Sequence, residues 1–425
     1  MKNKIPSTLA SAVLWSVISA AFIGPGTITT AVSAGSQFHL QLLWAVLFST
    51  FACVALQELA ARLSIATQLT LGEAMRKKFG HRLGGRLSYL VGGAVILGCA
   101  AYQAGNILGA IAGLQLLIPA GHVVLVLLMG VAVATILWRG KRQSISSVLT
   151  LLVVLMAGAF FLLATHGNFS GGDLVAYSIV PHFPSGAGLL TLGLVGTTIV
   201  PYNIFLGTGV SKGQTIPLMR IGVSISVLVG GAITACILLA GTLVPAFNSF
   251  EELAQVFQKE MGASGRYALA IGLFSAGFSS AITSPYAAAL VATTVFGWRD
   301  RAATAVWLAV LLVGLFFGVT QVKPIPVILL VQTLNGFILP LLGAYLILVI
   351  NDRALIPEIH RPGPIYNVVL LLIFAALLLL GLHSIDKTIS QLFPGAPAHW
   401  AVVVPLVIGA TGVLGYAIFR GRRLE

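Results

Sequence analysis

The residues Gly24-Pro25-Gly26-Thr27 interrupt a hydrophobic segment near its middle. The apolar runs on either side, 9–23 and 28–38, are each too short to cross a bilayer, but together they are long enough. Proline removes a backbone donor, and the flanking glycines let the chain leave helical geometry. Non-helical backbone at membrane depth is tolerated only where it is buried in protein or lines a cavity. We therefore expect a broken helix that binds a solute where its two halves meet.

A second interruption, from Thr197 to Asn203, lies inside the apolar segment 186–210 and contains Pro201. The first break falls in the first hydrophobic span and the second break in the sixth. Because five is an odd number, the second group of five helices starts from the opposite side of the membrane. Breaks at corresponding positions predict two inverted repeats, at about 8–166 and 186–350. The alternative is two unrelated proline kinks, which membrane helices also carry.

The composition indicates one polytopic all-α membrane domain over residues 1–425, because 58% of the residues are hydrophobic and only 8% are charged. After the two repeats, we expect two additional helices at 365–384 and 400–419. In all, hydropathy predicts twelve spans, at about 8–36, 40–64, 87–117, 122–138, 145–165, 186–210, 217–246, 265–296, 302–319, 325–350, 365–384 and 400–419.

The net charge of +13 is explained by membrane topology without a nucleic-acid partner. With the N-terminus in the cytoplasm, all but four of the 24 Lys and Arg residues fall on the inner side. The four outer residues are Lys259, Arg266, Lys323 and Lys387. This asymmetry predicts a multi-pass protein of the plasma (inner) membrane with both termini in the cytoplasm. The residues form no hydrolytic, redox or phosphate-binding motif, so we expect neither an enzyme nor a cofactor.

Five separated blocks of the chain lie at 34–38, 41–44, 61–67, 277–283 and 331–340. These blocks resemble the Nramp (natural resistance-associated macrophage protein) family of divalent-metal transporters. The resemblance covers about residues 8–350 and implies the leucine-transporter-type fold, with two inverted five-helix repeats and broken helices 1 and 6.

The chain departs from this family where the resemblance would place the metal ligands. Family members have Asp-Pro-Gly-Asn in the first helix, whose Asp and Asn bind the metal, and here Gly24 and Thr27 occupy those positions. The sixth helix of the family supplies an Ala carbonyl and a Met, which correspond to Thr197 and Val200. The His that follows the proline of that helix is Tyr202 here. The resemblance therefore implies a central site without charged or soft ligands.

The departures extend to the expected proton route. Proton-coupled family members carry an Asp and a Glu three residues apart in the third helix, and these align with Gln103 and Asn106. Among the acids, only Glu58 lies well inside a predicted span, four residues before Arg62. That order suits a helical ion pair, so a structural pair is the first interpretation and a proton relay the second.

The remaining site chemistry is neutral, and it permits two kinds of substrate. Oxygen atoms can hold a largely hydrated Mg²⁺, and the sequence offers them at Thr27, Thr197, Thr198, Asn203, Gln332 and Asn335. Alternatively, the unpaired N–H groups near Gly26 and Thr27 can receive a carboxylate, because no aspartate at position 24 repels it. An ion site in the eighth helix is a further possibility, although hydroxyl groups that pack helices explain the same residues, Ser279, Ser280 and Thr283.

Three functions follow from these observations. The first is a secondary transporter of a small solute other than Mn²⁺ or Fe²⁺, such as a carboxylate-bearing metabolite. The second is an Nramp-type divalent cation transporter with a weakly selective, Mg²⁺-like site, and the third is a non-transporting sensor on a transporter fold. We expect a monomer in the lipid bilayer. Residues 247–264 are expected to form an outer gating lid or a plain solvated loop.

Overall fold

The computed structural model describes residues 23–79, 83–140, 143–392 and 400–420, and every regular element in these ranges is helical. Ten helical segments of this part of the chain are long and apolar enough to cross a membrane. One of them, Pro25–Thr67, contains the second half of the first predicted span and all of the second. A shorter apolar helix, Leu149–Ala164, supplies the fifth predicted span. The structure thus has helices at all the predicted spans, apart from residues 8–22, which lie outside the described residues.

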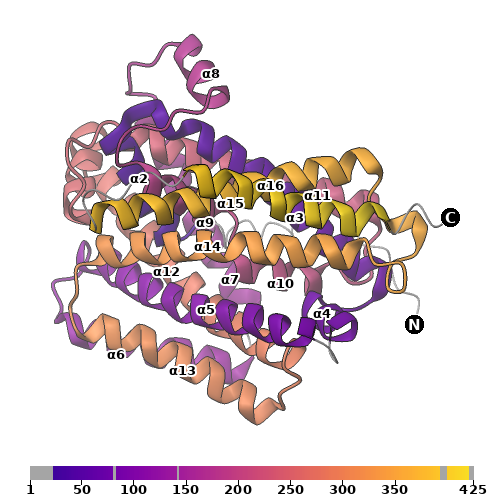
Figure 1. The fold of residues 1–425 in the computed structure, drawn as a ribbon. Helices are drawn as coiled ribbons and strands as arrows, with labels where there is room; N and C mark the ends of the chain where they lie inside the picture. The colour runs from indigo at the N-terminus through magenta and orange to yellow at the C-terminus, as the bar shows by residue number, and fades with distance from the viewer. Residues whose placement is uncertain (1–22, 80–82, 141–142, 393–399, 421–425) are drawn as a thin grey trace.

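The first half of the described chain forms the second half of a broken helix, four long helices and three short ones. Figure 1 shows these helices in indigo to magenta. Their bounds are α2 (Pro25–Phe38), η1 (His39–Leu42), α3 (Leu43–Thr67), α4 (Leu71–Phe79), α5 (Leu83–Gln115), α6 (His122–Arg139), α7 (Gln143–Ala164) and α8 (Gly171–Ile179).

The second half contains the other broken helix and the remaining long helices. Their bounds are α9 (Gly188–Thr198), α10 (Pro201–Val210), α11 (Ile216–Gly241), α12 (Phe250–Thr294), α13 (Asp300–Val319), α14 (Pro324–Ile350), η2 (Glu358–His360), α15 (Pro364–Leu392) and α16 (Trp400–Arg420). Helices α15 and α16 are the two additional helices that the sequence predicts.

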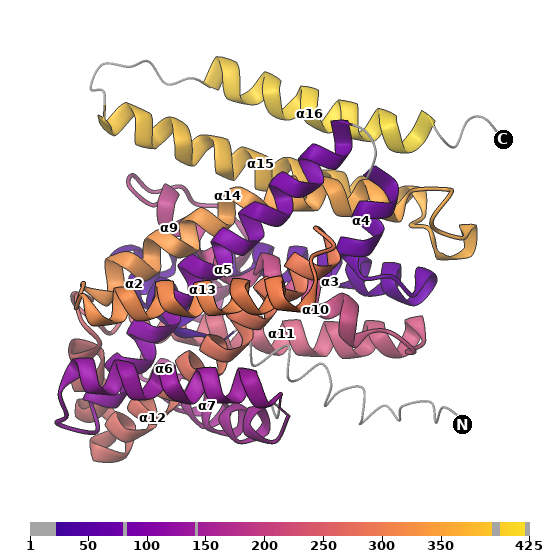
Figure 2. The ribbon, with the colours of Figure 1, turned by 90° about the horizontal axis from the view of Figure 1, so that it is seen from below.

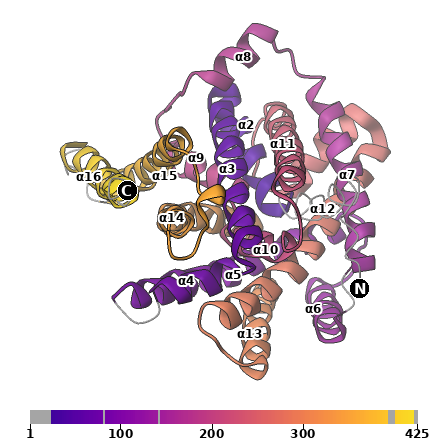
Figure 3. The same ribbon diagram turned by 90° about the vertical axis from the view of Figure 1, so that its right-hand side faces the viewer.

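The helices form a bundle with α5 near its middle. Helix α5 packs against α12 on one side and against α13 and α14 on others. Viewed from below, α15 and α16 form a layer outside α14, and α6 and α7 lie on the opposite side of the molecule (Figure 2). The end-on view shows the same order, with α2, α3, α9 and α10 between these two sides (Figure 3). The broken helices therefore lie inside the bundle.

Both interruptions are present where the described chain contains them. Gly24 is extended, and α2 begins at Pro25, where a missing N–H costs no helical hydrogen bond. Helix α9 ends at Thr198, and α10 begins at Pro201. The two residues between them, Ile199 and Val200, are not helical. The break in the sixth span is thus confirmed, and for the first span the structure describes the break and the half that follows it.

The expectation of a loop at residues 247–264 is wrong. Most of this segment is the first part of α12, which begins after Ser249 with a capping box: the Ser249 side chain accepts from the Glu252 N–H, and the Glu252 carboxylate accepts from the Ser249 N–H. Gly262, at φ +69°, then kinks the helix. A capping box needs only serine and glutamate three residues apart, so the signal was present in the sequence.

Glycines allow two backbones to touch where α2 packs against α11. A Cβ atom added at Gly35 would lie 2.0 Å from the Leu238 carbonyl oxygen, and one added at Gly241 would lie 2.7 Å from that of Val32. Such distances leave no room for any side chain, because backbone atoms cannot rotate away as a flexible side chain can. This contact fixes α2, and with it the break at Gly24, against the bundle.

We therefore predict that Gly35→Ala destabilises the protein by about 1–3 kcal/mol, the usual cost of overpacking a closely packed core. The measurement is thermal unfolding of the purified protein in detergent. The matched control is Gly93→Ala on α5, where an added Cβ meets no atom within 4 Å. Equal melting temperatures for the two variants would show that α2 and α11 can move apart to admit a methyl group without loss of stability.

Candidate functional site

A small polar pocket lies where the two breaks meet. It is enclosed by both broken helices together with α5, α12 and α14. Its lining residues are Gly24, Gly26, Thr27, Tyr102, Asn106, Thr197, Val200, Tyr202, Ser280 and Gln332. Among the described residues that line it, none carries a charge. The pocket thus gathers most of the residues that sequence analysis assigned to a neutral site.

The two broken helices touch through a pair of threonine hydroxyls. Thr27 Oγ1 lies 3.0 Å from Thr197 Oγ1, and both side chains are buried. Thr27 is in the first turn of α2, and Thr197 is in the last turn of α9. The first turn of a helix has N–H groups and the last turn has carbonyl groups without helical partners. The pocket therefore combines hydroxyl groups with backbone donors from one half-helix and backbone acceptors from the other.

Gln332 brings the amide of α14 against the break in the first helix. A Cβ at position 26 would lie 1.8 Å from Gln332 Nε2, so the side chain reaches this position only because residue 26 is glycine. Gln332 is buried, and its Oε1 has no hydrogen-bond partner within the described part of the chain. A buried acceptor without a partner costs free energy unless a ligand or water binds it. Gln332 Oε1 is thus a free acceptor at the site.

Tyr102 on α5 is the lining residue that the sequence analysis missed. Its hydroxyl donates to the carbonyl of Gly196 at 2.8 Å, and its ring meets that of Tyr202 edge-on, with centroids 5.4 Å apart. The bond satisfies one of the carbonyls that the end of α9 exposes. The one available signal was the four-residue spacing from Asn106, which places both side chains on one face of α5.

Six of the other predicted residues are not among those that line the pocket: Thr198, Asn203, Asn335, Gln103, Ser279 and Thr283. Thr198 Oγ1 donates to the Leu194 carbonyl, and Asn335 Nδ2 donates to that of Val331, so both bind their own helices. Gln103 Nε2 donates to the backbone carbonyl of Ala281 on α12 at 3.1 Å. Asn203 is buried, and neither of its amide atoms has a partner among the described residues. In the expected eighth-helix site, Thr283 donates to the Ser279 carbonyl within the same helix.

Ser280 is therefore the member of the eighth-helix group that lines the pocket. Its hydroxyl lies 3.3 Å from where a Cβ of Gly24 would be, so α12 faces the first break directly. In the described residues, no group of three or more His, Cys, Asp or Glu side chains is placed to hold a metal ion. Hydroxyl, amide and backbone groups are thus the ligands that this pocket offers.

Glu58 and Arg62 are buried and are not among the residues that line the pocket; they belong to a separate polar network. The Glu58 carboxylate accepts from Arg62, from Arg220 Nε at 2.9 Å and from the Tyr366 hydroxyl at 3.2 Å. The Arg62 guanidinium also lies over the Tyr366 ring, 5.4 Å from its centroid. The network joins α3, α11 and α15. A carboxylate with three donors favours the structural interpretation of Glu58 over a proton relay.

From this network we predict unequal costs for its members. Glu58→Gln leaves the buried Arg62 without its counter-ion, which should cost about 3–5 kcal/mol. Arg220→Gln should cost about 0–1 kcal/mol, because the Arg220 side chain is 53% exposed and water screens its charge. Thermal unfolding in detergent measures both variants. If Arg220→Gln is as harmful as Glu58→Gln, the carboxylate does not serve mainly to neutralise Arg62.

Comparison with known proteins identifies the family of the chain. The family model "Natural resistance-associated macrophage protein-like" matches residues 16–385. The divalent metal cation transporter MntH of Yersinia pestis (strain Pestoides F) is 26% identical over 294 residues, which are 65% of this chain and 70% of that protein. MntH of Mycobacterium tuberculosis (strain CDC 1551 / Oshkosh) is 25% identical over 310 residues, covering 66% and 69%.

Solved structures share the fold. A manganese transporter of Eremococcus coleocola, crystallised with an aromatic bis-isothiourea substituted compound, superimposes with a TM-score of 0.76 at 20% identity, covering 98% of this chain and 96% of that one. MhsT in complex with L-phenylalanine gives a TM-score of 0.59 at 18% identity, with 92% and 100% covered. The expected leucine-transporter-type fold is confirmed. The chain is a multi-pass integral membrane protein, and it belongs to the natural resistance-associated macrophage protein-like family.

Proposed function

We propose that this chain is a secondary transporter of divalent metal cations, which binds a hydrated, Mg²⁺-type ion in the pocket between its two broken helices. The observation that carries the proposal is the uncharged lining of that pocket in a member of this family. The relatives from Yersinia pestis and Mycobacterium tuberculosis are named divalent metal cation transporters. They support a metal cation better than the carboxylate-bearing solute that the sequence analysis put first.

The ligand chemistry supports a hard cation over a soft one. Thioether and thiolate ligands favour soft transition metals, and the described lining residues include neither Met nor Cys, since Val200 stands at the sixth-helix break. Mg²⁺ gives up its waters reluctantly and usually keeps several of them. Hydroxyl and amide oxygens such as those of Thr27, Thr197 and Gln332 can accept hydrogen bonds from these waters. A cation that kept its water shell would avoid most of the cost of desolvation, which a neutral site cannot offset. The pocket has a volume of about 10 Å³ in this structure, so it would have to widen to admit such an ion.

The arrangement of the half-helices supports alternating access. The pocket lies between elements from both halves of the chain, and in this fold the two repeats rock around a fixed site. The Thr27–Thr197 contact would have to lengthen when either side opens. We place the two repeats at about 8–166 and 186–350. In this proposal the protein is a monomer in the plasma (inner) membrane, and both of its termini are in the cytoplasm.

Uptake into liposomes tests the proposal directly. Purified protein in vesicles should take up Mg²⁺ in a saturable manner and show little saturable uptake of micromolar Mn²⁺ or Fe²⁺. A panel of amino and hydroxy acids is measured in the same vesicles. Saturable accumulation of one of these acids without Mg²⁺ uptake would overturn the cation proposal in favour of the carboxylate hypothesis.

The role of Val200 gives a second prediction. Val200→Met adds a thioether at the break, so the ratio of Mn²⁺ to Mg²⁺ uptake should rise about tenfold, equivalent to about 1.4 kcal/mol of added binding. Val200→Leu is the matched control, because it adds similar bulk without sulfur and should leave the ratio unchanged. A similar rise in both variants would mean that size, not ligand chemistry, sets the selectivity.

The neutral pocket also predicts how transport is driven. A neutral site that binds a divalent ion carries two charges when loaded and none when empty. The membrane potential supplies about 2.3 kcal/mol per elementary charge per 100 mV, and so about twice this for the loaded site. An inside-negative potential should therefore drive Mg²⁺ accumulation in liposomes, whereas a pH gradient alone should not. The reverse result, with loss of pH-driven uptake in a Glu58→Gln variant that still folds and takes up Mg²⁺ down its concentration gradient, would make Glu58 a proton relay.

A further inference from the structure

A long apolar groove runs along α14 on the side that faces α15. Its first part, of about 570 Å³, lies between α9, α14 and α15 and includes Gly193, Leu330 and Leu334. Its second part, of about 300 Å³, lies between α14, α15 and α16 and includes Leu378 and Gly381. Both volumes are in the range of about 300–1,000 Å³ that ligand sites occupy.

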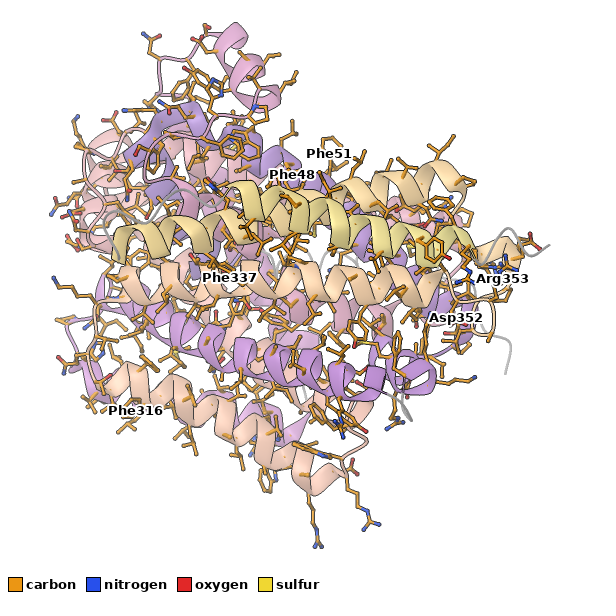
Figure 4. All side chains as sticks on the ribbon, viewed as in Figure 1. Phe48, Phe51, Phe316, Phe337, Asp352 and Arg353 are labelled. Carbon is orange, nitrogen blue, oxygen red and sulfur yellow. The ribbon has the colours of Figure 1, made fainter. Side chains whose placement is uncertain are left out.

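The two parts adjoin each other along α14, because they share lining residues. Phe337 on α14 and Ile385 on α15 line both of them. Figure 4 labels Phe337 along α14, on the side of the molecule that carries α16. From Pro326 to Ala344, the residues of α14 that line the groove extend over roughly 27 Å at about 1.5 Å per residue. This length approaches the hydrocarbon thickness of a bilayer, about 30 Å.

The groove opens toward lipid. Helices α14, α15 and α16 all contain candidate membrane spans, and α15 and α16 form an outer layer of the bundle (Figures 2 and 3). Leu330, Leu334 and Ile385 at the groove are 60%, 46% and 43% exposed. Apart from Thr30 and Thr333, the described lining residues are apolar or glycine. In a bilayer, a cavity of this kind is in contact with acyl chains.

We infer that this groove is a binding site for an acyl chain of a membrane phospholipid. A flexible hydrocarbon chain fits a groove that is long, narrow and apolar, and dispersion contacts with its walls favour occupancy over an empty space. A second copy of this chain fits less well, because helices associate in membranes through small residues that allow close backbone approach. Large, exposed side chains such as Leu330 and Leu334 line the groove, and their bulk opposes the close approach of a second helix.

The inner wall of the groove is formed by the two broken helices. Thr30 on α2 and Gly193 on α9 line its inner wall, and a Cβ at position 193 would lie 3.3 Å from Thr30 Cγ2. An acyl chain that reaches this wall leaves the surrounding lipid and contacts two half-helices. This recess distinguishes the groove from the rest of the lipid-facing surface, for example the exposed Phe316 on α13 (Figure 4).

Quenching of tryptophan by brominated phosphatidylcholine tests the inference without any transport assay. Phe337→Trp reports on the groove, and Phe316→Trp reports on open lipid-facing surface. Each is measured in detergent micelles with increasing brominated lipid, after subtraction of the parent protein's emission. We expect half-maximal quenching of the groove reporter at an about fourfold lower lipid fraction, the factor that burial of one additional methylene group supplies. Leu334→Trp is a second groove reporter in case Phe337→Trp does not fold.

Filling the groove provides the specificity control. Gly381→Leu places a side chain in the groove, since a Cβ there meets Phe337 at an ordinary 3.8 Å, and it should abolish the difference between the reporters. Gly412→Leu on α16, where an added Cβ meets no atom within 4 Å, should leave the difference intact. Equal quenching midpoints for the two reporters would overturn the inference, as would a difference that survives Gly381→Leu. Protection of the groove reporter in a protein dimer would likewise overturn it.

Discussion

A helix that stops inside a bilayer exposes backbone groups that lipid cannot satisfy, and the core of this structure is organised around two such ends. The carbonyl of Gly196 receives the Tyr102 hydroxyl, and the Thr27 and Thr197 hydroxyls meet across the gap. Small residues let the supporting helices come this close. A Cβ at Gly109 on α5 would lie 2.2 Å from Pro25, and one at Gly196 the same distance from the Gln332 carbonyl oxygen. Backbone groups at the two helix ends thus define the position of the site, and the side chains around them define which further polar groups it offers.

Replacing charged ligands by neutral ones changes what such a site can do. Charged ligands can repay the loss of a cation's water, whereas neutral hydroxyl and amide groups repay only part of it. The free Gln332 acceptor and the Thr27–Thr197 pair suit water-mediated contact, which costs less desolvation than direct coordination. Among the described residues, the charged side chains are outside the pocket lining, as in the Glu58 network. Selectivity would then depend on how tightly an ion holds its water.

Local signals allowed the sequence to predict the breaks, the spans and the Glu58–Arg62 pair. Pro25, Pro201 and their neighbours act on their own backbone, and Arg62 is one helical turn from Glu58. Contacts between distant segments could not be read in this way. Arg220 and Tyr366 reach Glu58 from α11 and α15, and Tyr102 reaches Gly196 from α5.

The pocket lining was predicted only in part for a related reason. Thr198 and Asn335 are close in sequence to Thr197 and Gln332, but their side chains bind their own helices. Which side chain of a helix faces a cavity depends on the rotation of that helix about its axis. Tertiary packing sets that rotation, for example through the Gly196–Gln332 contact between α9 and α14. The elements of the site were therefore predictable, and the orientation of each side chain was not.

The same two half-helices separate the polar pocket from the apolar groove. On α9, Thr197 lines the pocket, and Gly193, one turn earlier, lines the groove. On α2, Thr27 lines the pocket and Thr30 lines the groove. A half-helix that moves to open the pocket must therefore also change the width of the groove, because close-packed walls do not deform independently. If an acyl chain and an ion bind as proposed, both contact walls formed by these two half-helices, and binding of one would alter the binding free energy of the other.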